Sequence, residues 1–224
     1  MSVSKPSLDG VAELVAVIDR LRSPGGCPWY GEQTHASLVP YVIEEAFELV
    51  EAVETGTRDD LLEELGDVLL QVVLHARLAQ EGNQAPFDLD DVARGTAAKL
   101  VSRNPHVFAG ARAPDVEAVE VRYAELKRVE KGRDSVLDGV PPGLGALARA
   151  AKLASRAHRV GIEAPVPDDG SVGAALLRLT LEAVAAGLDP EAELRAATRS
   201  WEGAMRAAER SAPAQSASDK LAPE

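Results

Sequence analysis

Four acidic side chains, arranged as two pairs, carry the strongest chemical signal in the sequence. Glu45 and Glu48 are three residues apart, and so are Glu64 and Asp67. Residues with this spacing share one face of a helix, so each pair can present two carboxylates in the same direction. Converging carboxylates repel one another unless a cation neutralises them, and ligands that offer only oxygen favour Mg²⁺ or Mn²⁺ over zinc. The pattern therefore indicates a site for a hard divalent ion, which could bind phosphate oxygens and activate water for pyrophosphate-bond hydrolysis.

The position of the acids relative to Gly56 favours their convergence. Glu45 precedes this glycine by the same distance along the chain as Asp67 follows it. Glu48 and Glu64 are likewise equally far from it, and both are nearer to it than the other two acids. In two antiparallel helices joined by a turn at Gly56, residues equally far from the turn lie at the same height. Acids spaced by three are also common on solvated helix faces, so spacing alone leaves both interpretations open. The same segments contain further acids, namely Glu44, Glu51, Glu54 and Glu63.

Apolar residues at helical spacing surround the acids. Segments 37–53 and 59–81 both have this spacing, and residues 55–57 between them form a turn signal. Asp59 and Asp60 suit the N-terminus of the second helix, so we predict an antiparallel helical hairpin. Since patterns typical of β-strands are scarce, we expect an all-α helical bundle. Further helices are predicted at about residues 8–21, 89–103, 116–131, 146–159, 172–186 and 190–210.

The composition excludes several classes of protein. With 36 acidic and 24 basic side chains, the net charge of -12 disfavours binding to the phosphate backbone of nucleic acids. Cys27 is the only cysteine, which excludes an internal disulfide or a cysteine-rich zinc cluster and fits a reducing compartment. No segment has the apolar length of a signal peptide core or of a membrane span. We therefore expect a cytoplasmic protein that binds neither nucleic acid nor membranes.

The residues around the acids resemble a known family. Segments 44–48 (EEAFE) and 63–67 (EELGD) resemble the EExxE…ExxD signature of the MazG family. Flanking motifs also match: GCPW, EQT and PY between residues 26 and 41 resemble the family's GCPWD…EQT…PY segment, and KL at 99–100 with NPHVF at 104–108 resembles its KL…RHPHVF segment. The resemblance covers about residues 18–140. It implies an all-α, Mg²⁺-dependent enzyme, commonly a homodimer, that hydrolyses nucleoside triphosphates to monophosphates and pyrophosphate. Such house-cleaning of the nucleotide pool would act on standard or damaged nucleotides.

The resemblance also implies roles for individual residues. It makes the catalytic metal ligands Glu45, Glu48, Glu64 and Asp67. Lys99 and Arg103 match a basic pair expected to contact phosphates, and their spacing of four places them on one helical face. Tyr123 and Lys127 match positions near the substrate. Trp29 could stack on a base or pack in the core. For these substrate-site residues, ordinary surface placement is the alternative.

Several positions depart from the family pattern. Tyr30 stands where the family has an aspartate, and Tyr123 stands where it often has a tryptophan. Ser102 and Asn104 replace residues that are more commonly basic. These departures put base contacts and turnover in question, whereas the four acids are unchanged.

The remainder of the chain resembles part of a second copy of the same domain. We expect a catalytic domain at residues 1–137, a Gly- and Pro-rich linker at 138–145, a second MazG-like region at 146–210 and a disordered tail at 211–224. The second region has no ExxE…ExxD arrangement. We therefore predict that it is a degenerate, truncated repeat without catalytic activity.

Other functions remain as alternatives. A carboxylate-bridged di-iron bundle also uses inward-facing acids, but it needs a Glu-x-x-His motif that this hairpin lacks. A non-catalytic nucleotide-binding or regulatory module is the second alternative. Dinucleotide and P-loop sites are disfavoured, because no strand precedes the glycines at 143–145 and no GxxxxGK[ST] motif occurs. The four histidines are scattered without zinc spacing and are expected to be structural or on the surface.

Overall fold

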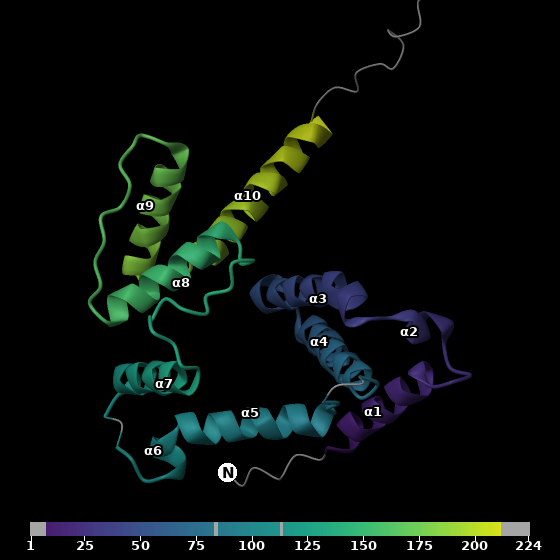
Figure 1. Cartoon of the computed structure of the whole chain (residues 1–224). Helices are drawn as coiled ribbons and strands as arrows, with labels where there is room; N and C mark the ends of the chain where they lie inside the picture. Colours follow the sequence, from purple (N-terminus) through teal and green to yellow (C-terminus); the bar gives the residue numbers. More distant parts are fainter. Residues whose placement is uncertain (1–7, 83–84, 113, 212–224) are drawn as a thin grey trace, which may run out of the picture. The chain divides into compact units, whose positions relative to one another are not determined.

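The computed structural model describes residues 8–82, 85–112 and 114–211, and all of their regular structure is helical (Figure 1). No β-strand occurs within those ranges, which confirms the predicted all-α class. None of the described helices is long and apolar enough to cross a membrane. The predicted disordered tail lies outside the described residues from position 212 onward. The helices in the described ranges are α1 (Asp9–Arg22), α2 (Pro28–Glu32), α3 (His35–Thr55), α4 (Arg58–Ala79), α5 (Leu89–Arg103), α6 (Pro105–Phe108), α7 (Val116–Glu130), α8 (Ala146–Arg159), α9 (Val172–Ala185) and α10 (Pro190–Ser211).

Two short helices were not expected from the sequence. Helix α2 has five residues and α6 has four, so neither is long enough to show an apolar period. Both begin with a proline, Pro28 or Pro105, whose fixed φ and missing N–H suit the first helical position. Segments that read as loops in the sequence therefore contain single helical turns.

The chain divides into two compact units, one ending at Ala111 and the other starting at Arg112. The first unit contains helices α1 to α6, and the second contains α7 to α10. The two units are defined by how the residues pack together. The predicted boundaries at residues 137 and 145 instead separate the catalytic domain, the linker and the second repeat. Those boundaries, and the degenerate second repeat, stay predictions.

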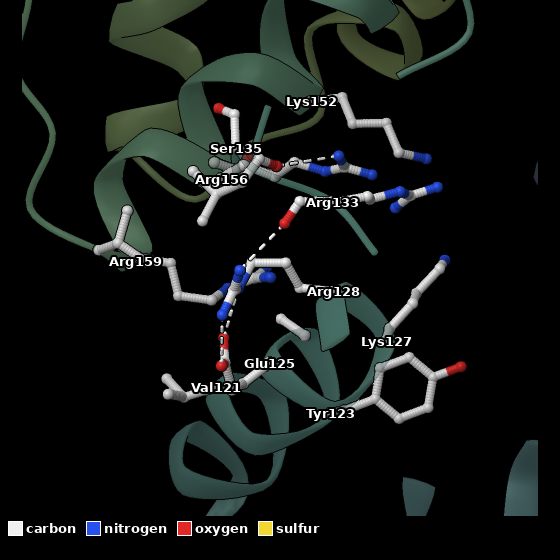
Figure 2. Close-up of a pocket in the computed structure, with 14 residues that line it drawn as sticks. Val121, Tyr123, Glu125, Lys127, Arg128, Arg133, Ser135, Lys152, Arg156 and Arg159 are labelled. Atoms are coloured by element: carbon white, nitrogen blue, oxygen red, sulfur yellow. Dashed lines mark hydrogen bonds and ion pairs between the residues drawn. The ribbon is translucent and has the colours of Figure 1, made fainter. Parts of the chain in front are cut away.

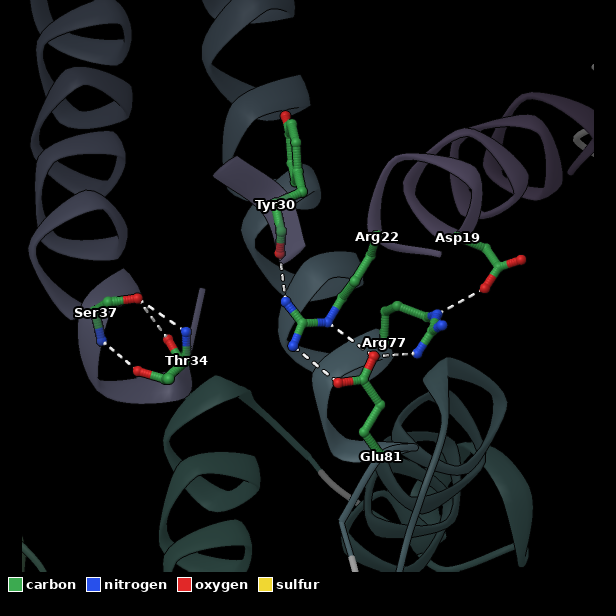
Figure 3. Close-up of polar contacts among 7 residues, drawn as sticks. All are labelled: Asp19, Arg22, Tyr30, Thr34, Ser37, Arg77 and Glu81. Atoms are coloured by element: carbon green, nitrogen blue, oxygen red, sulfur yellow. Dashed lines mark hydrogen bonds and ion pairs between the residues drawn. The ribbon is translucent and has the colours of Figure 1, made fainter. Parts of the chain in front are cut away.

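The predicted hairpin is the centre of the first unit, and α3 and α4 form its most extensive helix contact. Each helix starts with a capping box. The Thr34 hydroxyl accepts a hydrogen bond from the Ser37 N–H and the Ser37 hydroxyl accepts one from the Thr34 N–H (Figure 3). At α4 the Thr57 hydroxyl accepts a hydrogen bond from the Asp60 N–H, and the Asp60 carboxylate accepts one from the Thr57 N–H. Because the cap at Thr57 starts α4 directly after Gly56, the turn between the two helices is short.

The hydrophobic core lies at the end of the hairpin that is remote from Gly56. Ile18 of α1 packs there against Leu38, near the start of α3, and against the C-terminal half of α4 at Val73, Leu74 and Leu78. Ile18 and Leu38 are almost fully buried. The half of the hairpin nearer the turn, which carries the acidic pairs, lies outside this core and is therefore more open to solvent.

A polar network ties α1 to the end of α4 beside this core (Figure 3). Arg22 donates two hydrogen bonds to the Glu81 carboxylate, at 2.9 and 2.8 Å, and one to the Tyr30 carbonyl. Arg77 donates to Glu81 at 2.8 Å and to Asp19 at 2.7 Å. The Arg22 side chain is only 7% exposed, so these partners are needed to stabilise its buried charge.

In the second unit, α8 packs against α9 and α10. Glu191, near the start of α10, accepts a hydrogen bond from the Ala148 N–H at the start of α8. Thr180 and Ala174 of α9 are buried. The described helices of this unit follow the predicted segments to within about one residue, as is usual for helix ends.

Candidate metal centre

The helical hairpin brings three of the four predicted carboxylates together. Glu45 and Glu48 of α3 and Glu64 of α4 each offer an oxygen, and these oxygens lie within 4.8 Å of one another. No other group of three or more acids, histidines or cysteines with this closeness occurs in the described part of the chain. We call these residues the acidic cluster. Asp67, the fourth predicted ligand, is half-buried one turn further along α4 and does not belong to the group.

Negative charges perturb the ionisation of the acidic cluster. Partial burial, followed by the charges of Asp67 and Glu48, raises the pKa of Glu45 above its ordinary value. Partial burial, followed by the charges of Glu48 and Asp67, likewise raises the pKa of Glu64. Asp67 is therefore near enough to act on the cluster electrostatically. All the charged groups that act on these two glutamates are acids, so a cation would relieve the repulsion.

An unpartnered oxygen provides a second sign that a cation fits here. The Oε2 atom of Glu64 is buried and has no hydrogen-bond partner. Leaving a buried carboxylate oxygen unpaired is costly, so such atoms are rare unless an ion or water completes them. A hard divalent ion would satisfy this atom and neutralise its neighbours at the same time. The donor set, made of oxygen atoms on two rigid helices, thus fits magnesium or manganese better than zinc.

Gln71 is a functional neighbour that the sequence analysis missed. It is 8% exposed, lies one turn after Asp67 on α4, and its side chain hydrogen-bonds to Glu45, which lowers the pKa of that glutamate against the raising effects. Its own Oε1 atom is buried without a partner. The available signal was a lone amide inside the apolar run from Val68 to Leu74. A hydrogen bond from an amide in that position favours the charged form of Glu45.

Two of the histidines form a pair away from the acidic cluster. The Nδ1 atoms of His35 and His75 are 2.8 Å apart and the rings stack with centroids 5.0 Å apart. The pKa of His75 is lowered by burial and by the nearby His35. Neither histidine belongs to a group of three ligands among the described residues, and none joins the acidic cluster. The metal centre of a di-iron bundle would need such a histidine.

The predicted substrate-site residues are placed in different ways. Lys99 is exposed on α5, whereas Arg103, at the end of the same helix, is 7% exposed. Trp29 is 45% exposed and packs edge-to-face on Tyr30 and Tyr41, with ring centroids 4.9 and 5.9 Å apart. It is therefore not a core residue, and its indole retains an exposed surface. The roles of these residues in substrate binding stay predictions.

Tyr123 and Lys127 lie on α7 in the second unit. Both line a cavity there, four residues apart on the same helix. The acidic cluster and this cavity belong to different compact units, and each is described within its own unit.

Comparison with known proteins agrees with the motifs. Residues 33–108 match the MazG nucleotide pyrophosphohydrolase domain, a range that contains the acidic cluster, Asp67, Lys99 and Arg103. An uncharacterized 26.1 kDa protein of Streptomyces cacaoi is 50% identical over 199 residues, covering 88% of this chain and 81% of that protein. Two proteins named nucleoside triphosphate pyrophosphohydrolase are also similar. That of Mycobacterium tuberculosis is 42% identical over 89% of this chain and 58% of its own length, and that of Escherichia coli is 40% identical over 70% and 60%.

The chain thus spans about 60% of the length of these two named relatives. It spans most of the Streptomyces protein, at an identity far above the level at which folds diverge. Since the motif residues, the helical hairpin and the domain match coincide, the chain belongs to the MazG family.

Proposed function

We propose that this protein is a Mg²⁺-dependent hydrolase that cleaves nucleoside triphosphates to a nucleoside monophosphate and pyrophosphate. The observation that carries the proposal is the acidic cluster, with three carboxylates within 4.8 Å and the unpartnered Oε2 atom of Glu64 among them. The names of the relatives from Mycobacterium tuberculosis and Escherichia coli support the same reaction. Manganese is the expected substitute for magnesium, because both are hard ions that accept oxygen ligands.

The residues of the chain would divide the work as follows. Glu45, Glu48 and Glu64 hold the cation, with Asp67 as the proposed fourth ligand. Gln71 supports Glu45 through their hydrogen bond. A bound divalent ion would draw in phosphate oxygens and lower the pKa of an attacking water. Lys99 is exposed on α5, which packs against α4, and supplies positive charge for the phosphates. Hydrolysis adds water across the bond between the α- and β-phosphates, so pyrophosphate leaves as one unit.

Product analysis tests this function. The full chain is incubated with Mg²⁺ and a panel of standard and damaged triphosphates, and the products are separated by chromatography. We expect monophosphate and pyrophosphate in equal amounts, and no reaction after chelation of the metal. Release of orthophosphate and a diphosphate would contradict the proposal, and calorimetric binding without any pyrophosphate would indicate the non-catalytic module. Preference for damaged over standard nucleotides would support the house-cleaning role.

We also propose that the protein is a homodimer, because the hairpin exposes apolar side chains on its outer surface. Ile43 and Phe47 of α3 are 52% and 64% exposed, and Leu62 and Leu65 of α4 are 65% and 51% exposed. Large apolar side chains gathered on two packed helices are typical of an interaction surface. In a symmetric dimer, the same apolar side chains of a second copy would cover them.

Replacing Leu62 with aspartate should convert the dimer to a monomer, because a charge would be buried at the interface. Light scattering coupled to size exclusion would report the change from twice the chain mass to the chain mass of 23.6 kDa. Leu179→Asp is the matched control, since Leu179 is 61% exposed on α9 in the second unit. A wild-type protein that already elutes as a monomer would contradict the dimer.

We retain two further proposals from the sequence. The second region, residues 146–210, is proposed to be a catalytically empty remnant, because its sequence has no ExxE…ExxD arrangement. Metal-dependent hydrolysis that survives removal of all three cluster carboxylates would contradict it. The cytoplasm remains the proposed compartment because the single cysteine, Cys27, is a free thiol. Detection of the protein in a secreted fraction would contradict that compartment.

A further inference from the structure

A cavity of about 490 Å³ lies between α7, α8 and the loop that joins them (Figure 2). All its lining residues fall between Val121 and Val160, so the cavity is complete within the second unit. Its lining is strongly basic, although the chain as a whole carries a charge of -12. Glu125 is the acid in the lining. The basic residues are Lys127, Arg128, Arg133, Lys152, Arg156 and Arg159.

Two of these cations hold the walls of the cavity. Arg128 pairs with Glu125 at 2.8 Å and donates to the Arg133 carbonyl at 3.0 Å, which fastens the end of α7 to the following loop. Arg156 donates to the carbonyls of Val136 and Asp138 at 3.1 and 2.8 Å, which fastens the same loop to α8. Because their hydrogen bonds are already used within the protein, these two arginines have a structural role.

Three other cations have no such partners. The charged groups of Lys127, Arg133 and Lys152 make no hydrogen bond or ion pair within the part of the chain that the structure describes. Figure 2 shows these three groups projecting to the same side, together with the Tyr123 hydroxyl. Burial and the charges of Arg133 and Arg159 lower the pKa of Arg156, as expected where positive charge is in excess. None of these three charged groups is paired with an acid in the described part of the chain.

The backbone of the loop also accommodates Arg133. Gly139 has a φ of +70°, and a Cβ atom there would overlap the Arg133 guanidinium. Glycine at this position therefore leaves room for Arg133 while the turn adopts a left-handed conformation. Arg128 and Arg156 hold the backbone of this loop on both sides, which keeps Arg133 in the lining of the cavity.

Several cations on one side of a cavity suit a ligand with several linked negative charges. Phosphate groups accept hydrogen bonds from lysine and, in a forked arrangement, from arginine. A polynucleotide would need basic residues along an extended surface, whereas these cations are gathered in one hollow of an acidic protein. We propose that the cavity between α7 and α8 binds a phosphate chain, with Arg133 and Lys152 as two of its ligands. This site needs no residue of the acidic cluster, but its lining includes Tyr123 and Lys127, which are also predicted to bind substrate, so its ligand is either a separate phosphate chain or the tail of the nucleotide.

Calorimetric titration of the full chain with inorganic tripolyphosphate, in buffer containing a chelator, tests the proposal. We expect saturable binding by the wild type and at least about tenfold weaker binding by Lys152→Glu, which places a like charge beside the anion. Arg149→Glu is the matched control, because Arg149 is exposed on the same helix, lies outside the cavity and gives the same change in net charge. Arg133→Ala should weaken binding as well.

Two outcomes would overturn the site: no binding by the wild type, or equal binding by wild type and Lys152→Glu. Lys152 is exposed and its side chain makes no hydrogen bond or ion pair with the described residues, and circular dichroism would check the helicity of each variant. A second measurement identifies the source of the phosphate chain. If it is the tail of the hydrolysed nucleotide, Lys152→Glu should raise the KM for triphosphate; if it is a separate ligand, the KM stays constant while tripolyphosphate binding is lost.

Discussion

Replacing Glu48 with glutamine is expected to lower kcat for Mg²⁺-dependent triphosphate hydrolysis by about 10²- to 10³-fold, since a bound metal supplies several kcal/mol of transition-state stabilisation. Glu48 is one of the three carboxylates whose oxygens converge, and it is exposed rather than packed in the core. The amide has nearly the same shape but no charge, so the cluster would lose affinity for a hard ion. The fold should persist, with helicity near that of the wild type.

Initial rates measured across a Mg²⁺ titration check this prediction. Glu51→Gln is a matched control, because Glu51 is an exposed glutamate on α3 outside the acidic cluster. Thermal melting gives an independent readout: Mg²⁺ should raise the Tm of the wild type and of Glu51→Gln but not of Glu48→Gln, because only a bound ion stabilises the folded state. Turnover equal to that of the wild type would rule the acidic cluster out as the catalytic metal site.

The convergence of the acids could be predicted because a helix has a fixed rise and period. Counting positions from Gly56 placed Glu48 and Glu64 at one height, and the structure brings their oxygens together. The same counting could have revealed the histidine pair, since His35 and His75 lie on opposite sides of Gly56 at nearly equal distances along the chain. The regular rise of the two helices therefore predicts which side chains meet across a short helical hairpin, even when they are far apart in sequence.

What depends on side-chain packing could not be read from spacing. Nothing in the sequence separates Asp67 from the acids that converge, because that depends on rotamers and on small rotations of α4. The hydrogen bond between Gln71 and Glu45 has the same origin. The basic cavity depends on the loop between α7 and α8, which has no apolar period, so Arg133 and Lys152 could not be brought together from the sequence.

Removing the Glu81 carboxylate should cost about 2–3 kcal/mol of unfolding free energy, because breaking a buried ion pair leaves an unpaired charge. In the Glu81→Ala variant, Arg22 would keep its hydrogen bond to the Tyr30 carbonyl but lose both hydrogen bonds to the carboxylate. Its side chain is only 7% exposed in the wild type, so water cannot readily replace them. Glu81 itself is 43% exposed, which places the expected cost below that of a fully buried pair.

Urea unfolding near neutral pH measures this cost, and Asp19→Ala provides the contrast. Asp19 makes a single ion pair with Arg77 at 2.7 Å, but its side chain is 57% exposed. Its removal should therefore cost less than about 1 kcal/mol. If both variants lose the same free energy, burial of Arg22 is not what makes the network stabilising.

The pH dependence of that difference separates charge from packing. The hydrogen bonds from Arg22, with the charges of Arg22 and Arg77, lower the pKa of Glu81 below its ordinary value of 4.5. A lowered pKa means that the stabilisation is present above the ordinary value and is lost as the pH falls through the lower, folded-state value.

The acidic cluster acts in the opposite direction, because the raised pKa values of Glu45 and Glu64 make the folded state bind protons more readily than the unfolded chain. The unfolding free energy of the wild type alone would combine both effects. The contribution of the acidic cluster is the same in Glu81→Ala, so it cancels in the difference between the two proteins. That difference should be constant from about pH 7 to pH 5 and shrink toward pH 3; a difference that persists at pH 3 would mean that packing, rather than charge, is lost in the variant.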